Sequence, residues 1–340
     1  MYFKFIFCVF VTFFYQSSHV FGNNFPKLQL VLIDKSNASN SVNFTLDQAK
    51  NISSHPLFNH LLTTVVYSFG YTKTLNDPLV TTIIASYSKN RMYNLIIVDY
   101  SAYSTSNLSP PSIPDYTATI KNVKQIGFLV GNALWNTFGM KLAINFQLVG
   151  HSLGAHLSAF INRAIANATD NSFHMKIPVI IGLDPAAPLF FPFGNSTTMN
   201  DPLKPSDAQI VYVIHTDSVY FGAPIKIGTI DFWPNGGSNQ PGCPPFNPTT
   251  SIADFNNYCS HQRSVFYFSE AISNSNLKTF NAVKCNSWDQ FKKKMCFYLP
   301  FNLNNMGLYP TLLTGDFYLQ TSNTSPFSLG FKGMFYNATI

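Results

Sequence analysis

The feature that most constrains the fold is an apolar run that ends in a glycine–serine–glycine turn and continues into a helical pattern. Ile144–Val149 is the run, Gly150-His-Ser-Leu-Gly154 is the turn, and an apolar stretch follows. A Gly-x-Ser-x-Gly motif between a buried strand and a helix is typical of a nucleophile elbow, whose serine stands on a strained turn. Side chains at the flanking positions would collide, so both must be glycine. We predict Ser152 as a nucleophile with the N–H of Leu153 directed at an oxyanion; the alternative is an ordinary turn with an idle serine.

Further apolar or β-branched runs recur along the chain, as expected for strands buried on both faces of a largely parallel sheet. Two intervening stretches, Pro114–Thr137 and Leu153–Ala168, are long enough for helices. The alternation predicts an α/β fold with helices on both faces of the sheet. Beyond Thr216 the pattern loosens into loops, and we interpret 23–340 as one domain. The other expected strands are Leu28–Ile33, Thr63–Tyr67, Asn94–Asp99, Pro178–Leu183 and Gln209–Ile214.

The N-terminus has the pattern of a secretory signal peptide. Lys4 precedes the apolar stretch Phe5–Tyr15, and Gly22 offers a cleavage position, so residues 1–22 are the expected signal. The apolar stretch is shorter than the roughly 20 residues that span a bilayer, so we expect a secreted, extracellular chain without a transmembrane span. The net charge of the 340 residues is +6. No basic run is long enough to form a nucleic-acid surface, so no nucleic-acid partner is expected.

Cysteines and sequons agree with an oxidising route. Four cysteines remain after the signal, and of their three possible pairings the short loops favour Cys243–Cys259 and Cys285–Cys296. Their spacing is not that of a metal site and no nucleotide-binding motif occurs, so we expect neither a metal nor another cofactor. Asn-x-Ser/Thr glycosylation candidates stand at Asn37, Asn43, Asn51, Asn107, Asn167, Asn195, Asn323 and Asn337.

A nucleophilic serine needs a base, and that base needs an orienting carboxylate. The strand after the elbow runs directly into Asp184, at the sheet edge where Ser152 should lie; a helix N-cap is the alternative role. Two histidines follow, His215 at a strand end and His261 on an expected loop shortly after a cysteine. Spacing favours His261 as the base, while His215 can be a structural histidine.

Taken together, these motifs resemble the pancreatic-lipase-like family of secreted α/β-hydrolases, and most closely its insect lipases and wasp-venom-type phospholipases A1. The matching segments occur in one order over roughly residues 65–265. The resemblance implies an α/β-hydrolase fold without cofactors, with Ser152 as nucleophile, Asp184 as acid and His261 as base. The segments are Asn94–Asp99, Gly150–His156, Gly182–Ala186, Ser206–Ala208, Val213–Thr216, Asp231–Gly237, Gln240–Cys243 and Cys259–Ser264.

The resemblance also implies a second oxyanion donor. In the family this donor is a backbone N–H from a His-Gly-aromatic segment after an early strand, and here that segment is Phe69-Gly70-Tyr71. The N–H of Tyr71 would then act beside that of Leu153. The chain departs from the family in carrying Phe69 in place of the histidine, and Ala187 where the family usually has glycine.

Substrate choice is inferred from the two loops that cover the site in this family. Here the lid between two cysteines is Pro244–Tyr258, and the second covering loop is Ser218–Ile227. The resemblance implies that short loops accompany phospholipase A1 activity and longer ones triacylglycerol lipase activity. The lid's apolar side chains that could meet a lipid interface are those of Phe246, Ile252, Phe255 and Tyr258.

We therefore expect a lipid carboxylic-ester hydrolase that acts at a membrane or emulsion interface. Phospholipase A1, which releases the sn-1 fatty acid, is the favoured activity, and triacylglycerol lipase is the alternative. A non-catalytic carrier or yolk-type protein is a further alternative, and a small-ester or peptide hydrolase fits the apolar lid less well. We also expect a monomer, and a chain that ends too early for the C-terminal β-sandwich of the pancreatic enzymes.

Overall fold

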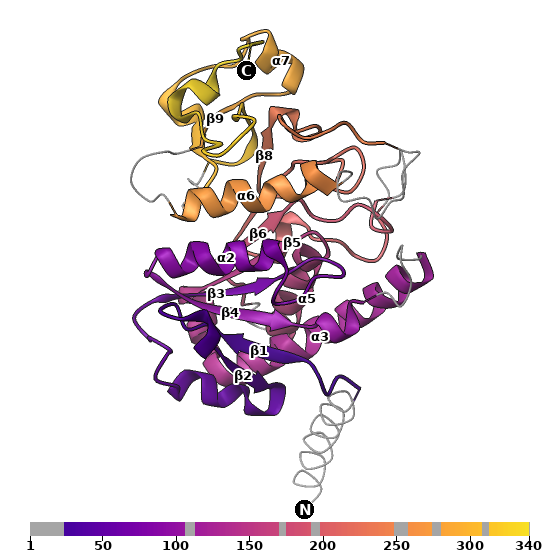
Figure 1. Cartoon of the computed structure of the whole chain (residues 1–340), viewed down its shortest axis with the longest axis vertical. Coiled ribbons are helices and arrows are strands. Elements are labelled where there is room, and N and C mark those ends of the chain that lie inside the picture. Colours follow the sequence, from indigo (N-terminus) through magenta and orange to yellow (C-terminus); the bar gives the residue numbers. More distant parts are fainter. Residues whose placement is uncertain are drawn as a thin grey trace, which may run out of the picture.

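The fold is built around one mixed sheet of parallel and antiparallel strands, which extends in Figure 1 from β2 near the bottom to β9 near the top. The structure is a computed structural model, and it describes residues 24–105, 113–169, 175–191, 198–247, 258–273, 280–307 and 313–339. The predicted signal peptide, 1–22, lies outside these residues. The strands are β1 (Gln29–Leu32), β2 (Val42–Thr45), β3 (Thr63–Ser68), β4 (Tyr93–Asp99), β5 (Phe146–His151), β6 (Val179–Leu183), β7 (Ile210–Ile214), β8 (Ile230–Pro234), β9 (Asn281–Lys284), β10 (Leu303–Asn305) and β11 (Gly315–Leu319).

The strands lie in the order β10-β9-β11-β8-β7-β6-β5-β3-β4-β1-β2. From β4 to β11 the neighbours are parallel, and antiparallel pairs occur only toward the two edges. The central strands are apolar along their whole length because they are covered on both faces. The prediction of a largely parallel α/β sheet is confirmed.

Helices cover both faces of the sheet. They are α2 (Pro78–Lys89), α3 (Ile113–Phe138), α4 (Leu142–Asn145), α5 (Leu153–Ala168), α6 (Cys259–Ser273) and α7 (Trp288–Lys292). The helices α3 and α5 pack against each other on one face, and α2 packs against α6 on the other (Figure 1). In the part of the chain that the structure describes, none of the helices is long and apolar enough to cross a membrane.

Two sequence expectations need correction. The strand expected to begin at Ile144 begins at Phe146, because the two preceding residues close the short helix α4. The region beyond Thr216 is rich in loops, as expected, but it also holds β8, α6, β9, α7, β10 and β11. Its strands are short and interrupted by polar residues and proline, so the local pattern is weak. They form because β7 and then β8 offer hydrogen-bonding edges on which each next strand can pair.

The contact between α3 and α5 depends on two glycines of α3. A Cβ at Gly127 would lie 2.4 Å from Phe160 Cβ, and one at Gly131 would lie 2.4 Å from Ile161 O. The helices therefore approach to backbone contact, and this close packing holds α5, whose first turn follows the predicted nucleophile.

We predict that Gly131→Ala destabilises the chain by about 1–3 kcal/mol, because the new methyl group forces the two helices apart. Gly307→Ala is the matched control, since its Cβ would meet neighbours only at 3.6 Å, an ordinary contact. Urea unfolding of both variants measures the effect. Equal unfolding free energies for the two variants would contradict the packing described.

Candidate active site

The elbow at the end of β5 is a strained turn, as the sequence predicts. Ser152 has φ 55° and ψ −121°, a backbone conformation that non-glycine residues rarely adopt, and α5 begins at the next residue. A Cβ at Gly150 would lie 2.2 Å from Gly154 O, and a Cβ at Gly154 would lie 2.1 Å from Ser68 O. Both flanking glycines are therefore required by the neighbouring backbone, and Ser152 remains partly exposed.

Strand register brings the serine and the predicted acid to the same edge of the sheet. His151 pairs with Leu183, and Leu183 pairs with Ile214, in the parallel ladders of β5, β6 and β7. The N–H of Ser152 donates to Leu183 O at 2.9 Å, and that of Asp184 donates to Ile214 O at 2.8 Å. The two residues thus follow directly on neighbouring strand ends.

The carboxylate of Asp184 holds the predicted base. Its Oδ2 lies 2.6 Å from His261 Nδ1, while its Oδ1 accepts the backbone N–H groups of Thr216 at 2.7 Å and Asp217 at 3.1 Å. Asp184 is fully buried and His261 is 4% exposed. These three hydrogen bonds satisfy the buried carboxyl oxygens of Asp184 and fix the orientation of the imidazole.

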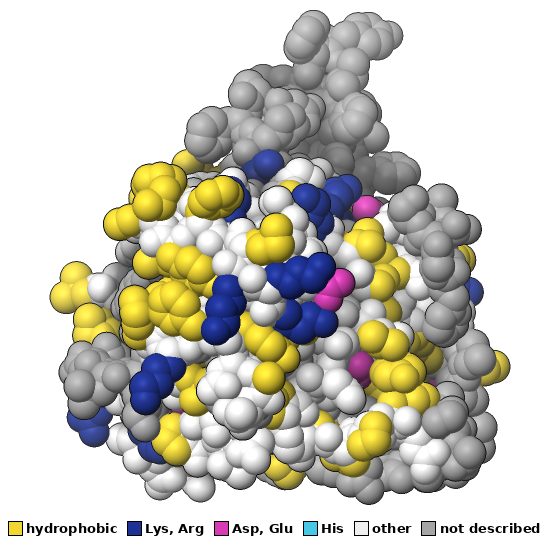
Figure 2. Space-filling view, turned by 90° about the horizontal axis from the view of Figure 1, so that it is seen from above, with side chains coloured by type: hydrophobic (Ala, Val, Ile, Leu, Met, Phe, Trp, Pro, Cys, Tyr) yellow, Lys and Arg dark blue, Asp and Glu magenta, His cyan; other side chains and the backbone are white. Residues whose placement is uncertain are grey.

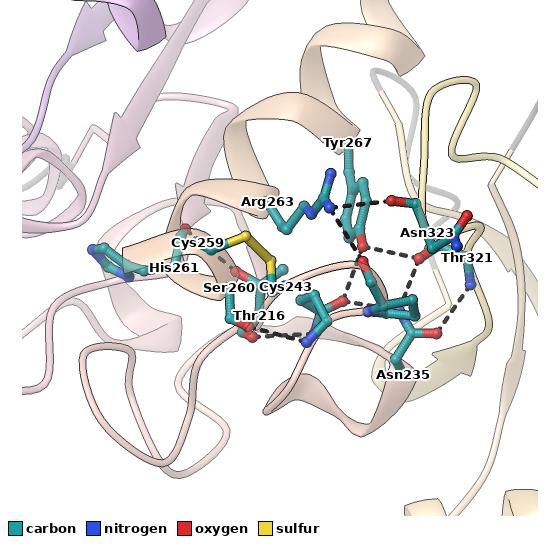
Figure 3. Close-up of a disulfide and its surroundings, with 12 residues drawn as sticks. Thr216, Asn235, Cys243, Cys259, Ser260, His261, Arg263, Tyr267, Thr321 and Asn323 are labelled. Carbon is teal, nitrogen blue, oxygen red and sulfur yellow. Dashed lines mark hydrogen bonds between the residues drawn. A yellow bond between two sulfur atoms is a disulfide. The ribbon is translucent and has the colours of Figure 1, made fainter. Parts of the chain in front are cut away.

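His261 lies in a helix and not on the expected loop. It is the third residue of α6, whose first residue forms the Cys243–Cys259 disulfide, with a Cα–Cα distance of 5.5 Å. The Ser260 Oγ accepts the N–H of Gln240 at 3.0 Å. The disulfide and this bond hold the first turn of the helix, and in Figure 3 the imidazole is directed away from the disulfide. A run beginning Cys-Ser-His-Gln-Arg carries little apolar periodicity, so sequence reasoning missed the helix.

A polar network next to the Cys243–Cys259 disulfide centres on the buried Gln240, to which sequence reasoning gave no role. Its members Thr216, Tyr267 and Thr321 are drawn in Figure 3. Gln240 Nε2 donates to Thr216 O at 3.1 Å and to Pro234 O at 3.0 Å. Tyr267 OH donates to Gln240 Oε1 at 3.1 Å and pairs with Thr321 Oγ1 at 2.9 Å. The network ties α6 to the ends of β7, β8 and β11. Asn235, Arg263 and Asn323 complete it.

His261 lies close to Ser152, the third member of the predicted triad. The rings of His261 and His151 have centroids 4.8 Å apart, and Ser152 is the next residue. Among the described residues no hydrogen bond joins Ser152 Oγ to His261, and such bonds are often long before substrate binds. Burial and the nearby His261 hold the pKa of His151 well below its usual value, so its ring stays neutral beside the base.

The loop after β3 lies against the elbow. A Cβ at Gly70 would lie 3.1 Å from Ser152 Cβ, so the backbone beside Tyr71 passes close to the serine. Phe69, which replaces the family's histidine, is buried and stacks on Tyr100 at 4.8 Å. The Tyr100 hydroxyl also donates to Phe69 O. Phe69 is thus packed into the core, and the hydrogen bond from Tyr100 fixes its backbone carbonyl.

Two other histidines of the described residues after Ser152 have other partners. His215 Nε2 lies 2.8 Å from Asp231 Oδ1, and its ring stacks on Trp233 at 3.8 Å. His156 Nε2 donates to Ala186 O at 2.8 Å, while its Nδ1 accepts the N–H of Leu203 at 3.0 Å. Both are buried and support loops of the fold, so neither takes the place next to Asp184.

Aromatic side chains of the two covering loops gather over His261. Phe221 of the second loop stacks on Tyr258, the last residue of the lid, at 4.3 Å, and its ring is 5.9 Å from that of His261. Tyr220 stacks on Phe246 at 3.9 Å and so joins the two loops. The two other apolar lid residues of the sequence analysis, Ile252 and Phe255, lie outside the described residues.

The covalent features agree with the sequence analysis where they are described. Both predicted disulfides, Cys243–Cys259 and Cys285–Cys296, are present. Among the sequon asparagines, Asn107 and Asn195 lie outside the described residues. The other six side chains are exposed, as attachment of a glycan requires: Asn37, Asn43, Asn51, Asn167, Asn323 and Asn337.

The chain matches a known protein family over most of its length. The model of the family described as Lipase matches residues 18–327. The chain belongs to the lipase family. Its fold, with a strand–serine–helix elbow on a mostly parallel sheet, is the α/β-hydrolase fold.

Three curated relatives show the range of similarity. Phospholipase A1 of Vespula vulgaris is 28% identical over 87% of this chain and 83% of that protein. Lipase member H of Xenopus tropicalis is 29% identical over 83% of this chain and 57% of its own length. Pancreatic lipase-related protein 2 of Myocastor coypus is 35% identical over 56% of this chain and 41% of its own. The chain thus spans little more than half the length of the Lipase member H relative.

This lipase-family chain carries a second buried carboxyl group at the site, which sequence reasoning missed. Asp217 follows the end of β7 and is 2% exposed, and its Oδ2 has no hydrogen-bond partner among the described residues. Burial, and then the charge of Asp184, raise the pKa of Asp217 to about 9. Asp217 is therefore protonated at neutral pH, so it does not add a second negative charge beside Asp184. An acidic residue just past a strand next to the one ending in Asp184 was the available signal.

We predict that Asp217→Asn changes how stability depends on pH. The folded chain keeps a proton on Asp217 that the unfolded chain releases above about pH 4. Stability of the unmodified chain therefore falls as pH rises from that value toward 9, by at most about 1.4 kcal/mol per pH unit. Asparagine does not titrate, so the variant lacks this fall and its melting temperature gains on that of the unmodified chain between pH 5 and 8. Parallel melting curves over this range would contradict the assignment.

Proposed function

We propose that the chain is a lipid carboxylic-ester hydrolase that works through a Ser152–His261–Asp184 triad. The observation that carries the proposal is the Asp184 carboxylate, held by two backbone N–H groups and hydrogen-bonded to His261 beside a strained, partly exposed serine. A non-catalytic carrier of the same family has no need of this complete arrangement. Membership of the lipase family supports the reaction class.

Each group has one role in the proposed reaction. Ser152 Oγ attacks the ester carbonyl as His261 Nε2 removes its proton, and the N–H groups of Tyr71 and Leu153 stabilise the oxyanion. The first N–H of a helix has no partner within the helix, so that of Leu153 can donate at the start of α5. His261 then returns the proton to the leaving alcohol. His261 then deprotonates a water that attacks the acyl-serine, and it returns this proton to Ser152 Oγ as the bond to the acyl group breaks and the fatty acid leaves.

Phospholipase A1 is the activity we propose within this class. Its support is the short second covering loop, whose Tyr220 and Phe221 stack on Phe246 and Tyr258 at the described ends of the lid. A site with short covering loops leaves room for a polar head group beside the serine. The extent of the match to a phospholipase A1, over 83% of that protein, supports the same choice. The 33% identity to a pancreatic triacylglycerol lipase of Oryctolagus cuniculus, over 69% of this chain, keeps triacylglycerol hydrolysis as the second candidate.

We also propose that the chain is secreted and glycosylated. Two disulfides in the described residues favour an oxidising compartment, and exposed sequons offer acceptor sites. Cleavage after Gly22 stays a prediction of the sequence, as does the monomeric state.

We predict that the secreted protein releases sn-1 fatty acid from phosphatidylcholine vesicles faster than it releases fatty acid from a triacylglycerol emulsion. Ser152→Ala should lower both rates by at least about 10³-fold without lowering the melting temperature, because it removes the nucleophile and little else. Ser54→Ala, at the exposed end of the 3-10 helix Leu46–Ser54, is the matched control and should keep full activity. Titration of released fatty acid measures both substrates.

The same assay separates the alternatives. Faster release from the emulsion would replace phospholipase A1 by triacylglycerol lipase. Release from neither substrate, by a protein that melts cooperatively, would overturn the enzymatic proposal in favour of a carrier.

A further inference from the structure

Exposed hydrophobic side chains concentrate at the end of the molecule that carries α7. Six of the fifteen large hydrophobic residues that are exposed in the described chain fall within 295–301 and 331–335, so they form a patch and not a scatter. Phe297 is 74% exposed, and Phe301 and Phe331 are each 64% exposed. The other three are Met295, Leu299 and Phe335.

The two segments lie side by side and are held from beneath. Phe335 stacks on Tyr298 at 4.7 Å, which joins the two segments, and it contacts Phe331 of its own segment at 5.3 Å. The Cys285–Cys296 disulfide ends next to Phe297. Beneath them lies a small core separate from the main one, made of Trp233, Val283, Cys285, Phe291, Cys296 and Tyr318. The exposed side chains are therefore displayed by a packed scaffold.

Basic side chains accompany this apolar surface. Lys292, Lys293 and Lys294 precede Met295, and Lys332 follows Phe331. Figure 2 looks onto this end of the molecule, and Lys and Arg side chains gather there among hydrophobic ones with few acidic neighbours. Asp289 lies 2.8 Å from Lys292 and neutralises it, whereas no ion pair engages the other three lysines among the described residues. We call Lys293, Lys294, Lys332 and the six hydrophobic residues the basic aromatic patch.

From this combination we infer that the basic aromatic patch docks the protein onto an anionic phospholipid bilayer. Aromatic and long aliphatic side chains enter the interfacial region of a bilayer, and lysines beside them are attracted to anionic head groups. A second copy of this chain is a poor occupant of the patch, because its three lysines would lie against the same three lysines and repel them. The inference rests on the proposed lipid-ester function, because a bilayer is where such an enzyme finds its substrate.

The patch is connected to the loop that covers the predicted active site. Lys226 of the covering loop pairs with Asp316 at 3.8 Å, and Asp316 O accepts the N–H of Cys285 at 3.2 Å. On the same loop Val219 is 58% exposed and Tyr220 is 41% exposed. The loop that carries these exposed side chains is therefore tied to the scaffold of the patch.

The test uses full-length Ser152→Ala protein, so that vesicles stay intact whether or not the proposed reaction is correct. Binding is measured by co-sedimentation with vesicles of phosphatidylglycerol and phosphatidylcholine, and with phosphatidylcholine alone. We expect the joint change Lys293→Gln, Lys294→Gln and Lys332→Gln to lower partitioning onto the anionic vesicles on the order of 100-fold at low salt. Phe297→Ser with Phe301→Ser should lower it by at least about tenfold. All five side chains are exposed, so folding should be unaffected.

Control variants change the same residue types elsewhere. Lys121→Gln with Lys124→Gln, and Phe128→Ser, alter exposed positions of α3 on another part of the molecule and should bind as the unmodified chain does. With Ser152 restored, the patch variants should lose hydrolysis of vesicles but keep hydrolysis of a soluble short-chain ester. Failure of the ester reaction in every protein would count against the proposed function and leave the binding result intact.

Two results would overturn the inference. One is equal vesicle binding by patch and control variants. The other is self-association of the chain in sedimentation velocity that disappears in the patch variants while vesicle binding persists, which would assign the patch to a second copy.

Discussion

The site depends on the environment of one buried carboxylate. Asp184 is fully buried, and an unpaired charge there would be costly, so its hydrogen bonds to Thr216, Asp217 and His261 are a condition of stability as well as of geometry. The partners come from two elements: the segment after β7 supplies both N–H groups, and α6 supplies the imidazole. The carboxylate therefore holds the sheet edge and the first turn of α6 in one fixed arrangement.

Two titratable groups near Asp184 and His261 add no further charge to the site at neutral pH. Asp217 is protonated at neutral pH, and the ring of His151 is neutral because burial lowers its pKa. Neither group adds a competing charge where an imidazolium would form during the proposed reaction. The strained backbone of Ser152 is maintained by close packing, since Gly150, Gly154 and Gly70 bring three backbone segments together around it.

Much of the fold and of the candidate site is readable from the sequence, for a physical reason. Strands buried on both faces need continuous apolar runs, so β3 through β7 are visible as such, and α5 has the predicted bounds Leu153–Ala168. The elbow is visible because only glycine fits at two of its positions. The region after Thr216 is different: β8 contains aspartate and proline, α6 starts with polar residues, and Gln240 looks like any loop residue. These elements are stabilised by pairing and hydrogen bonds to distant residues, which leave little local pattern.

The sequence by itself determined the central strands of the sheet, the position of Ser152, the candidate acid and the disulfide partners, because each rests on local apolar patterning, on glycine sterics or on short loops. Spacing favoured His261 over His215 as the base, without showing a contact. Only the tertiary structure showed which one meets Asp184, because that depends on where α6 and the end of β7 lie in space. The same holds for the protonated Asp217 and for the basic aromatic patch. A pKa is set by burial and neighbouring charge, and a surface is made of segments that folding brings together.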